Sequence, residues 1–83
     1  MFIPCREIAK GPGPGEAVIA VETRDGSEEL VVSSSLVKGG TLEVGSVIGR
    51  DNGHSLIELP RESLSGKWRI WVATTALRAA QAA

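Results

Sequence analysis

The dipeptide Asn52-Gly53 constrains the fold more than any other feature of this sequence. It separates two runs of strand-forming residues, Leu42 to Arg50 and His54 to Leu59. Asn-Gly favours the two-residue turn of a β-hairpin, because both positions require a positive φ angle. The pattern therefore predicts an antiparallel pair ending at Pro60, with Asp51 opposite His54, Ile48 opposite Ile57 and Ser46 opposite Leu59.

A second hairpin is predicted around Asp25-Gly26, another favoured turn dipeptide. The flanking runs, Ala17 to Thr23 and Glu28 to Ser33, are rich in β-branched residues. A two-residue loop here gives a core face on which Val21 is opposite Leu30 and Ile19 is opposite Val32. On the outer face it places Glu22 opposite Glu29 and Ala20 opposite Val31.

The remainder of the chain predicts one further strand and two short helical segments. Residues 60–66 fit a single helical turn, Lys67 to Val72 alternates as a fifth strand, and the alanine-rich stretch Ala73 to Ala83 favours a helix. Gly45 and Gly49 lie within a strand pattern, where glycine indicates bulges or bends that help small barrels to close. We therefore predict a mainly β protein, a small five-stranded antiparallel SH3-like or OB-like barrel with a short C-terminal helix.

The run Gly11-Pro12-Gly13-Pro14-Gly15 is the clearest boundary in the chain. Proline cannot donate to a strand ladder and glycine is costly to order. We expect residues 1–15 to form a flexible, poorly packed N-terminal arm, and residues 16–83 to form the single barrel domain.

Composition narrows the possible functions. The chain has 83 residues, a formal net charge of −1, one cysteine and one histidine, so neither an internal disulfide nor a histidine–cysteine metal site is expected. The longest apolar run, Ala17 to Val21, is far shorter than a membrane span, and no secretory signal is visible at the start. No nucleophile–base arrangement or phosphate-binding glycine motif is present. We expect a cytoplasmic protein without enzymatic activity, cofactor or membrane association.

The segment Lys67-Trp68-Arg69-Ile70-Trp71-Val72 supplies the candidate site. Alternation places Trp68 with Ile70 and Val72 on the core face, and Lys67, Arg69 and Trp71 on the other. Tryptophan and arginine dominate interface hot spots, so Lys67, Arg69 and Trp71 are candidate binding residues. The alternative is that the C-terminal helix covers Trp71 while the two cations reach past it to water.

These features favour a small binding or assembly module that associates with itself or with another protein. Oligomerisation is a common way for a small sheet to cover exposed edges and apolar outer-face residues such as Ala20 and Val31. The alternative is a nucleic-acid-binding barrel that uses Lys67, Arg69 and Trp71 to contact phosphates and stack on bases. The pI of about 5.8 disfavours it, because nucleic-acid-binding domains are usually basic.

Overall fold

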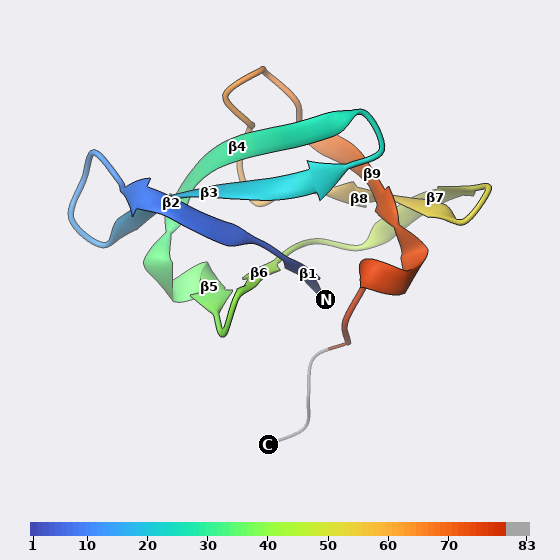
Figure 1. Ribbon diagram of the computed structural model, residues 1–83, viewed down its shortest axis with the longest axis horizontal. Helices are drawn as coiled ribbons and strands as arrows, with labels where there is room; N and C mark the ends of the chain where they lie inside the picture. Colours follow the sequence, from blue (N-terminus) through green and yellow to red (C-terminus); the bar gives the residue numbers. More distant parts are fainter. Residues whose placement is uncertain (80–83) are drawn as a thin grey trace.

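The protein is mainly β and is built from three small antiparallel sheets (Figure 1). The computed structural model describes residues 1–79. The first sheet has the order β1 (Phe2–Pro4), β6 (Thr41–Glu43), β5 (Val37–Lys38). The second has the order β2 (Arg6–Lys10), β3 (Glu16–Thr23), β4 (Gly26–Ser33). The third has the order β7 (Val47–Asp51), β8 (His54–Glu58), β9 (Arg69–Ala73).

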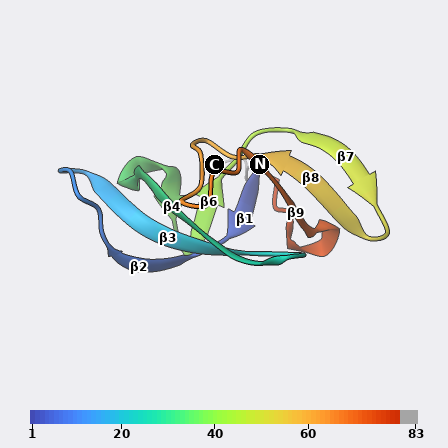
Figure 2. The same ribbon diagram turned by 90° about the horizontal axis from the view of Figure 1, so that it is seen from above.

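The three sheets enclose one hydrophobic core in a flat molecule of 38 × 34 × 16 Å (Figure 2). All three sheets contribute fully buried side chains, because each presents one apolar face to the others. The core side chains are Ile3, Ala17, Ile19, Val21, Leu30, Val32, Leu42, Val44, Ile57, Leu59, Ile70 and Val72. Within residues 1–79 the strands do not close into a barrel, so the predicted barrel is replaced by three separate sheets.

One reason is that the predicted strand Leu42 to Arg50 is divided between two sheets. Its first part belongs to β6 and its last part to β7, and the chain crosses from one sheet to the other between them. At the crossing Gly45 donates its N–H to the carbonyl of Glu58 (2.9 Å). A Cβ atom at Gly45 would lie 3.2 Å from the Cβ of Glu58, so the close approach favours glycine.

The β3–β4 hairpin forms with the predicted faces but with a register shifted by two residues. Thr23 is opposite Gly26 and Ile19 is opposite Leu30, so the turn residues are Arg24 and Asp25. Gly26 adopts a φ of +115°, so the glycine lies at the end of a turn that begins one residue earlier than predicted. Because the shift is even, the predicted core residues remain buried. Glu22 is opposite Ser27, however, and the predicted Glu22–Glu29 and Ala20–Val31 pairs do not form.

The β7–β8 hairpin has the predicted turn. Asn52 and Gly53 have φ angles of +46° and +78°, and Asp51 is opposite His54. A bulge between Val47 and Gly49 changes the far end of the pairing. Val47 therefore replaces Ile48 opposite Ile57, and Ile48 is exposed.

Part of the predicted arm is paired into sheets as β1 and β2, and the prediction of poor packing is wrong for β1. The Ile3 side chain is 1% exposed and belongs to the core, because β1 pairs with β6. The strand β2, in contrast, is exposed along its whole length. The glycine–proline run forms the connection between β2 and β3.

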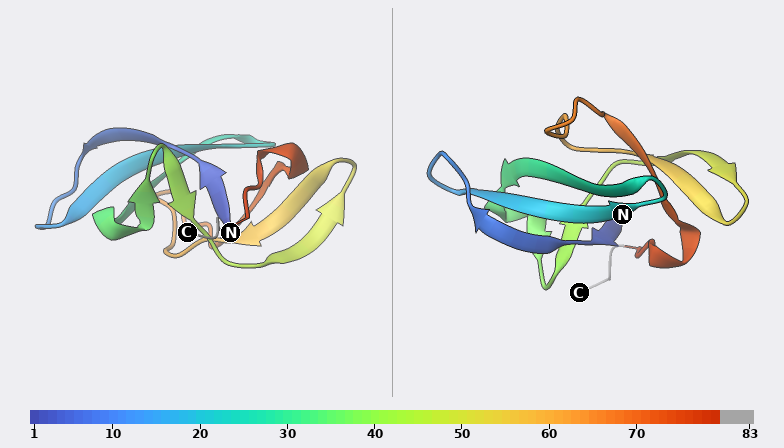
Figure 3. Two further views of the ribbon diagram at one scale, coloured as in Figure 1. Left: turned by 90° about the horizontal axis from the view of Figure 1, so that it is seen from below. Right: turned by 45° about the horizontal axis from the view of Figure 1, so that its top comes forward.

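The predicted C-terminal helix is also wrong as far as residue 79. A single 3₁₀ turn (Thr74–Ala76) follows β9, and the chain then returns to form a bridge between Arg78 and Phe2 (Figure 3). Thr74 is held by backbone and hydroxyl hydrogen bonds to Gly53 and Ser55 (2.9 and 2.7 Å). These contacts outweigh the small preference of so short a segment for helix. The last four predicted helical residues lie outside the described part of the chain.

The helical turn predicted for residues 60–66 is also wrong, because these residues form turns and no helix.

Candidate binding surface

Trp71 lies on the outer face of β9, as the alternation of the sequence predicts. Ile70 and Val72 are buried, and Arg69 and Trp71 lie on the opposite face. Arg69 is exposed and lies opposite Glu58 of β8. Trp71 is half-buried opposite Leu56.

Trp71 is engaged within the molecule by the β3–β4 turn. The guanidinium carbon of Arg24 lies 4.6 Å from the centroid of the Trp71 ring, a cation–π contact. The Arg24 N–H donates to the Trp71 carbonyl (2.8 Å), and the guanidinium also contacts Asp51 (3.3 Å). Trp71 is thus covered by Arg24 and not by a C-terminal helix. The contacts between Arg24 and Trp71 join the second sheet to the third.

The segment Pro60–Trp68, which we call the 60–68 loop, connects β8 to β9 and has a fixed backbone. Ser63 is 4% exposed, and its N–H donates to the carbonyl of Lys67 (2.8 Å). The Lys67 N–H donates in return to the Ser63 hydroxyl (3.0 Å). Where the loop joins the sheet, Leu59 donates to the carbonyl of Trp68 (2.8 Å).

Glu28 of β4 holds the same loop by its side chain. The Ser65 hydroxyl donates to the Glu28 carboxylate (2.5 Å), and the Lys67 ammonium lies 3.6 Å from it. Hydrogen bonds from Ser65 and Ser63, together with the charge of Lys67, lower the pKa of Glu28 below its usual value. One residue further along β4, the carbonyl of Glu29 accepts the N–H of Leu64 (2.8 Å). The loop is therefore anchored along the edge of β4.

This anchored loop presents two large apolar side chains to water. Trp68 is 57% exposed and Leu64 is 65% exposed. The prediction that Trp68 is a core residue is therefore wrong: β9 begins at Arg69, so Trp68 precedes it, while Leu59 opposite it is buried. The alternation of apolar and polar residues predicts which face of a strand a residue occupies, but it does not predict at which residue the buried part of the strand begins.

The three predicted binding residues do not form one continuous site. Arg69 and Lys67 flank Trp68, whereas Trp71 is occupied by Arg24. The charge around Trp68 is mixed, since Lys67 is paired with Glu28 and Arg69 lies opposite Glu58. The exposed Trp68 side chain therefore has cationic neighbours along the chain whose charges are balanced by Glu28 and Glu58.

Other parts of the described chain offer little chemistry. A small, mainly apolar pocket is lined by Ile3, Pro4, Cys5, Arg6, Ala20, Glu22, Val72 and Ala76. Burial, and secondarily the charge of Glu7, raises the pKa of the Cys5 thiol, which disfavours the reactive thiolate. Across residues 1–79 no three His, Cys, Asp or Glu side chains are grouped to hold a metal ion. In that same range no helix is long and apolar enough to cross a bilayer.

Comparison of the chain with protein-family models, with curated proteins and with solved structures finds no match.

Proposed function

We propose that this protein is a non-enzymatic binding module that docks protein surfaces through Leu64 and Trp68 of the 60–68 loop, and that it associates with itself. The observation that carries the proposal is the 57% exposure of Trp68 on a backbone fixed by hydrogen bonds. Isolated exposed apolar residues are common, but tryptophan is the residue most enriched in interface hot spots.

The anchoring of the loop supports this reading. A docking loop that is already ordered loses little conformational entropy when it binds, so more of the contact energy appears as affinity. Ser63, Ser65 and Lys67 are all used to fix the loop against β4. Leu64 and Trp68 are left free to contact a partner.

The nucleic-acid alternative has weaker support. The pairing of Lys67 with Glu28 reduces the positive charge available to a phosphate, and Glu58 lies opposite Arg69. Protein binding to phosphates weakens steeply with salt, because counterions are released. If the protein does not bind nucleic acid, addition of a single-stranded oligonucleotide should leave the Trp68 fluorescence unchanged at both low and high salt. A steeply salt-dependent response would favour the nucleic-acid alternative.

Sedimentation equilibrium tests the proposal directly. The average mass of the wild-type protein should rise with concentration, and Trp68→Ala should lower it because it removes the centre of the surface. Ile48→Ala is the matched control, since Ile48 is also a large exposed apolar residue but lies on β7. A wild-type protein that is monomeric at all concentrations, or a mass unaffected by Trp68→Ala, would contradict the proposal.

A further inference from the structure

The strand β2 has a free edge. It pairs with β3 on one side only, since it is the first strand of the order β2-β3-β4. Among residues 1–79, no backbone hydrogen bond reaches β2 from outside its own sheet. The opposite edge of this sheet is partly occupied, because Glu29 of β4 accepts a hydrogen bond from Leu64. A free strand edge is a template for pairing with another strand.

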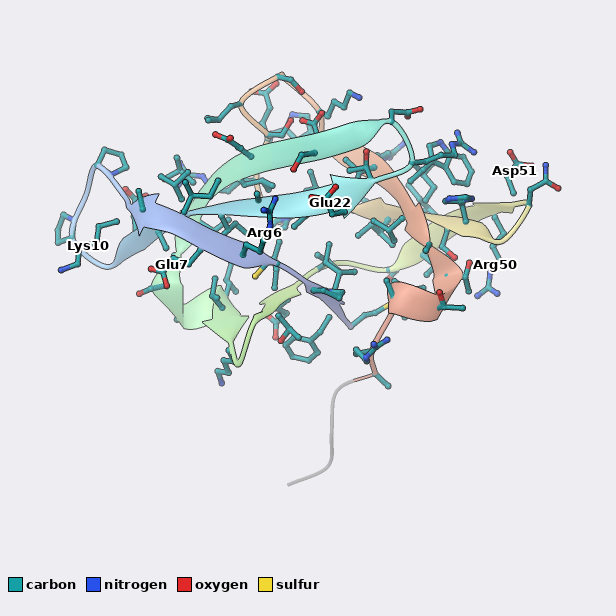
Figure 4. All side chains as sticks on the ribbon, viewed as in Figure 1. Arg6, Glu7, Lys10, Glu22, Arg50 and Asp51 are labelled. Atoms are coloured by element: carbon teal, nitrogen blue, oxygen red, sulfur yellow. The ribbon has the colours of Figure 1, made fainter. Side chains whose placement is uncertain are left out.

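A bulge in β2 places two opposite charges on one face. Glu7 is opposite Ile19 and Lys10 is opposite Ala17, and both of these β3 residues are buried. In a regular strand, residues three apart lie on opposite faces. Here the register shift around Ile8 brings Glu7 and Lys10 to the same face of β2, because their partners Ile19 and Ala17 share one face of β3. Figure 4 labels both residues along β2.

We propose that two copies of this chain pair along their β2 strands, antiparallel about a two-fold axis between Ile8 and Ala9. In this register Glu7 is opposite the partner's Lys10, and Lys10 is opposite the partner's Glu7. Opposite charges directly across an antiparallel pair are stabilising, and two-fold symmetry makes the contact twice. The result is a continuous six-stranded sheet. This inference rests on the self-association included in the proposed function, but it uses a different surface.

The charges of β2 are arranged to select this partner. Charged edges often prevent pairing, and a strand with only one sign of charge would repel its copy. In β2, Arg6 is paired with Glu22 (3.1 Å), whereas Glu7 and Lys10 form no ion pair within residues 1–79. The two unpaired charges are therefore the ones that face each other across the two-fold axis.

Another edge strand, β7, is a poorer partner for β2. An antiparallel β2–β7 contact could place Arg6 opposite Asp51 and Glu7 opposite Arg50 of another copy. It would compete with two existing ion pairs, because Arg6 contacts Glu22 and Asp51 contacts Arg24 (3.3 Å). It would also be a head-to-tail contact, which generates rings or filaments rather than a closed dimer.

Charge reversal in a Trp68→Ala background tests the β2 pairing, because that substitution removes the loop contact. Sedimentation equilibrium should show a monomer–dimer equilibrium. Glu7→Lys or Lys10→Glu alone should raise the dissociation constant about tenfold, since each creates two like-charge pairs. The double variant Glu7→Lys/Lys10→Glu should restore the original dissociation constant. Lys38→Glu, at the exposed position of β5, is the matched control and should have no effect.

The outcomes separate this inference from the proposed docking loop. A Trp68→Ala protein that is monomeric at all concentrations overturns the β2 pairing and leaves the docking loop as the basis of the wild-type association. A double variant that fails to restore association, or a dimer lost on Arg50→Glu instead, also overturns it. If Trp68→Ala leaves the wild-type mass unchanged while the β2 reversals dissociate the protein, the β2 pairing stands and the loop proposal fails.

Discussion

Trp68 and Trp71 are three residues apart, yet they have opposite surroundings. Trp71 lies within β9, where Arg24 stacks on it and Leu56 is its cross-strand neighbour. Trp68 precedes β9 and is 57% exposed, although its backbone is hydrogen-bonded to Leu59. Trp71 lies inside the strand and helps to hold two sheets together, whereas Trp68 lies just before the strand and remains exposed. The position at which β9 begins therefore determines the surroundings of each tryptophan.

The largest expected effect is on stability and concerns Trp71. Trp71→Ala should lower the free energy of unfolding by about 2–3 kcal/mol, less than full burial would give, because the ring is half-buried. Trp68→Ala should change it by less than about 0.5 kcal/mol, as is usual for exposed positions. Urea unfolding followed by circular dichroism measures both. Equal losses in the two variants would remove the distinction between the two residues.

A smaller effect should follow from releasing the 60–68 loop. Glu28→Ala removes the acceptor of the Ser65 hydroxyl and the partner of Lys67, so it should cost about 1–2 kcal/mol. Glu29→Ala is the matched control, because the Glu29 side chain is exposed and only its backbone holds the loop. If both variants unfold at the same urea concentration, the Glu28 side chain does not anchor the loop.

The same contact has a defined pH dependence. The pKa of Glu28 is lowered in the folded protein, so the unfolded state binds a proton more readily than the folded state. The stabilisation is complete above the ordinary glutamate pKa of about 4.3 and is lost as the pH falls through the lower folded pKa. Unfolding curves measured between about pH 3 and pH 6 should therefore depend less on pH in Glu28→Ala than in Glu29→Ala. Equal pH slopes in the two variants would contradict this.

Among the contacts within the molecule, the smallest expected effect is at Arg24. Arg24→Ala removes the cation–π contact and the exposed ion pair to Asp51, at a cost of about 0.5–1 kcal/mol. The emission of Trp71 should shift to longer wavelength as water reaches the ring, and the emission of Trp68 should not change. Fluorescence of Arg24→Ala combined with Trp68→Phe or Trp71→Phe resolves the two signals. A shift in the emission of Trp68 alone would contradict the contact between Arg24 and Trp71.

Local chemistry made much of the fold predictable. The Asn52-Gly53 turn and the buried face of β3 follow from turn preferences and from alternation, which act over a few residues. The register of β3–β4 was missed by two residues because Gly26 ends the turn instead of lying within it. The separate sheets and the burial of Ile3 depend on contacts between distant segments, such as the pairing of β1 with β6. Turn preferences and alternation within a few residues cannot predict such long-range contacts.

The candidate site was only partly predictable. Alternation predicted Lys67, Arg69 and Trp71 on one face, and Arg69 and Trp71 do share the outer face of β9, but the exposed tryptophan is Trp68. The sequence could not reveal that Arg24, 47 residues away, covers Trp71, since that contact joins two hairpins. No local signal marks the later start of β9 at Arg69, because Gly66 fits a strand that begins at Lys67 equally well.

Acrylamide quenching of single-tryptophan variants tests the central claim most directly. Trp71→Phe leaves Trp68 as the only fluorophore, and Trp68→Phe leaves Trp71. If the 60–68 loop is the docking surface, Trp68 should be strongly quenched in dilute protein and progressively protected as concentration rises. The quenching of Trp71 should be weaker and independent of concentration. Quenching of Trp68 that stays constant while sedimentation shows association would contradict the account, because the copies would then be joined without the loop.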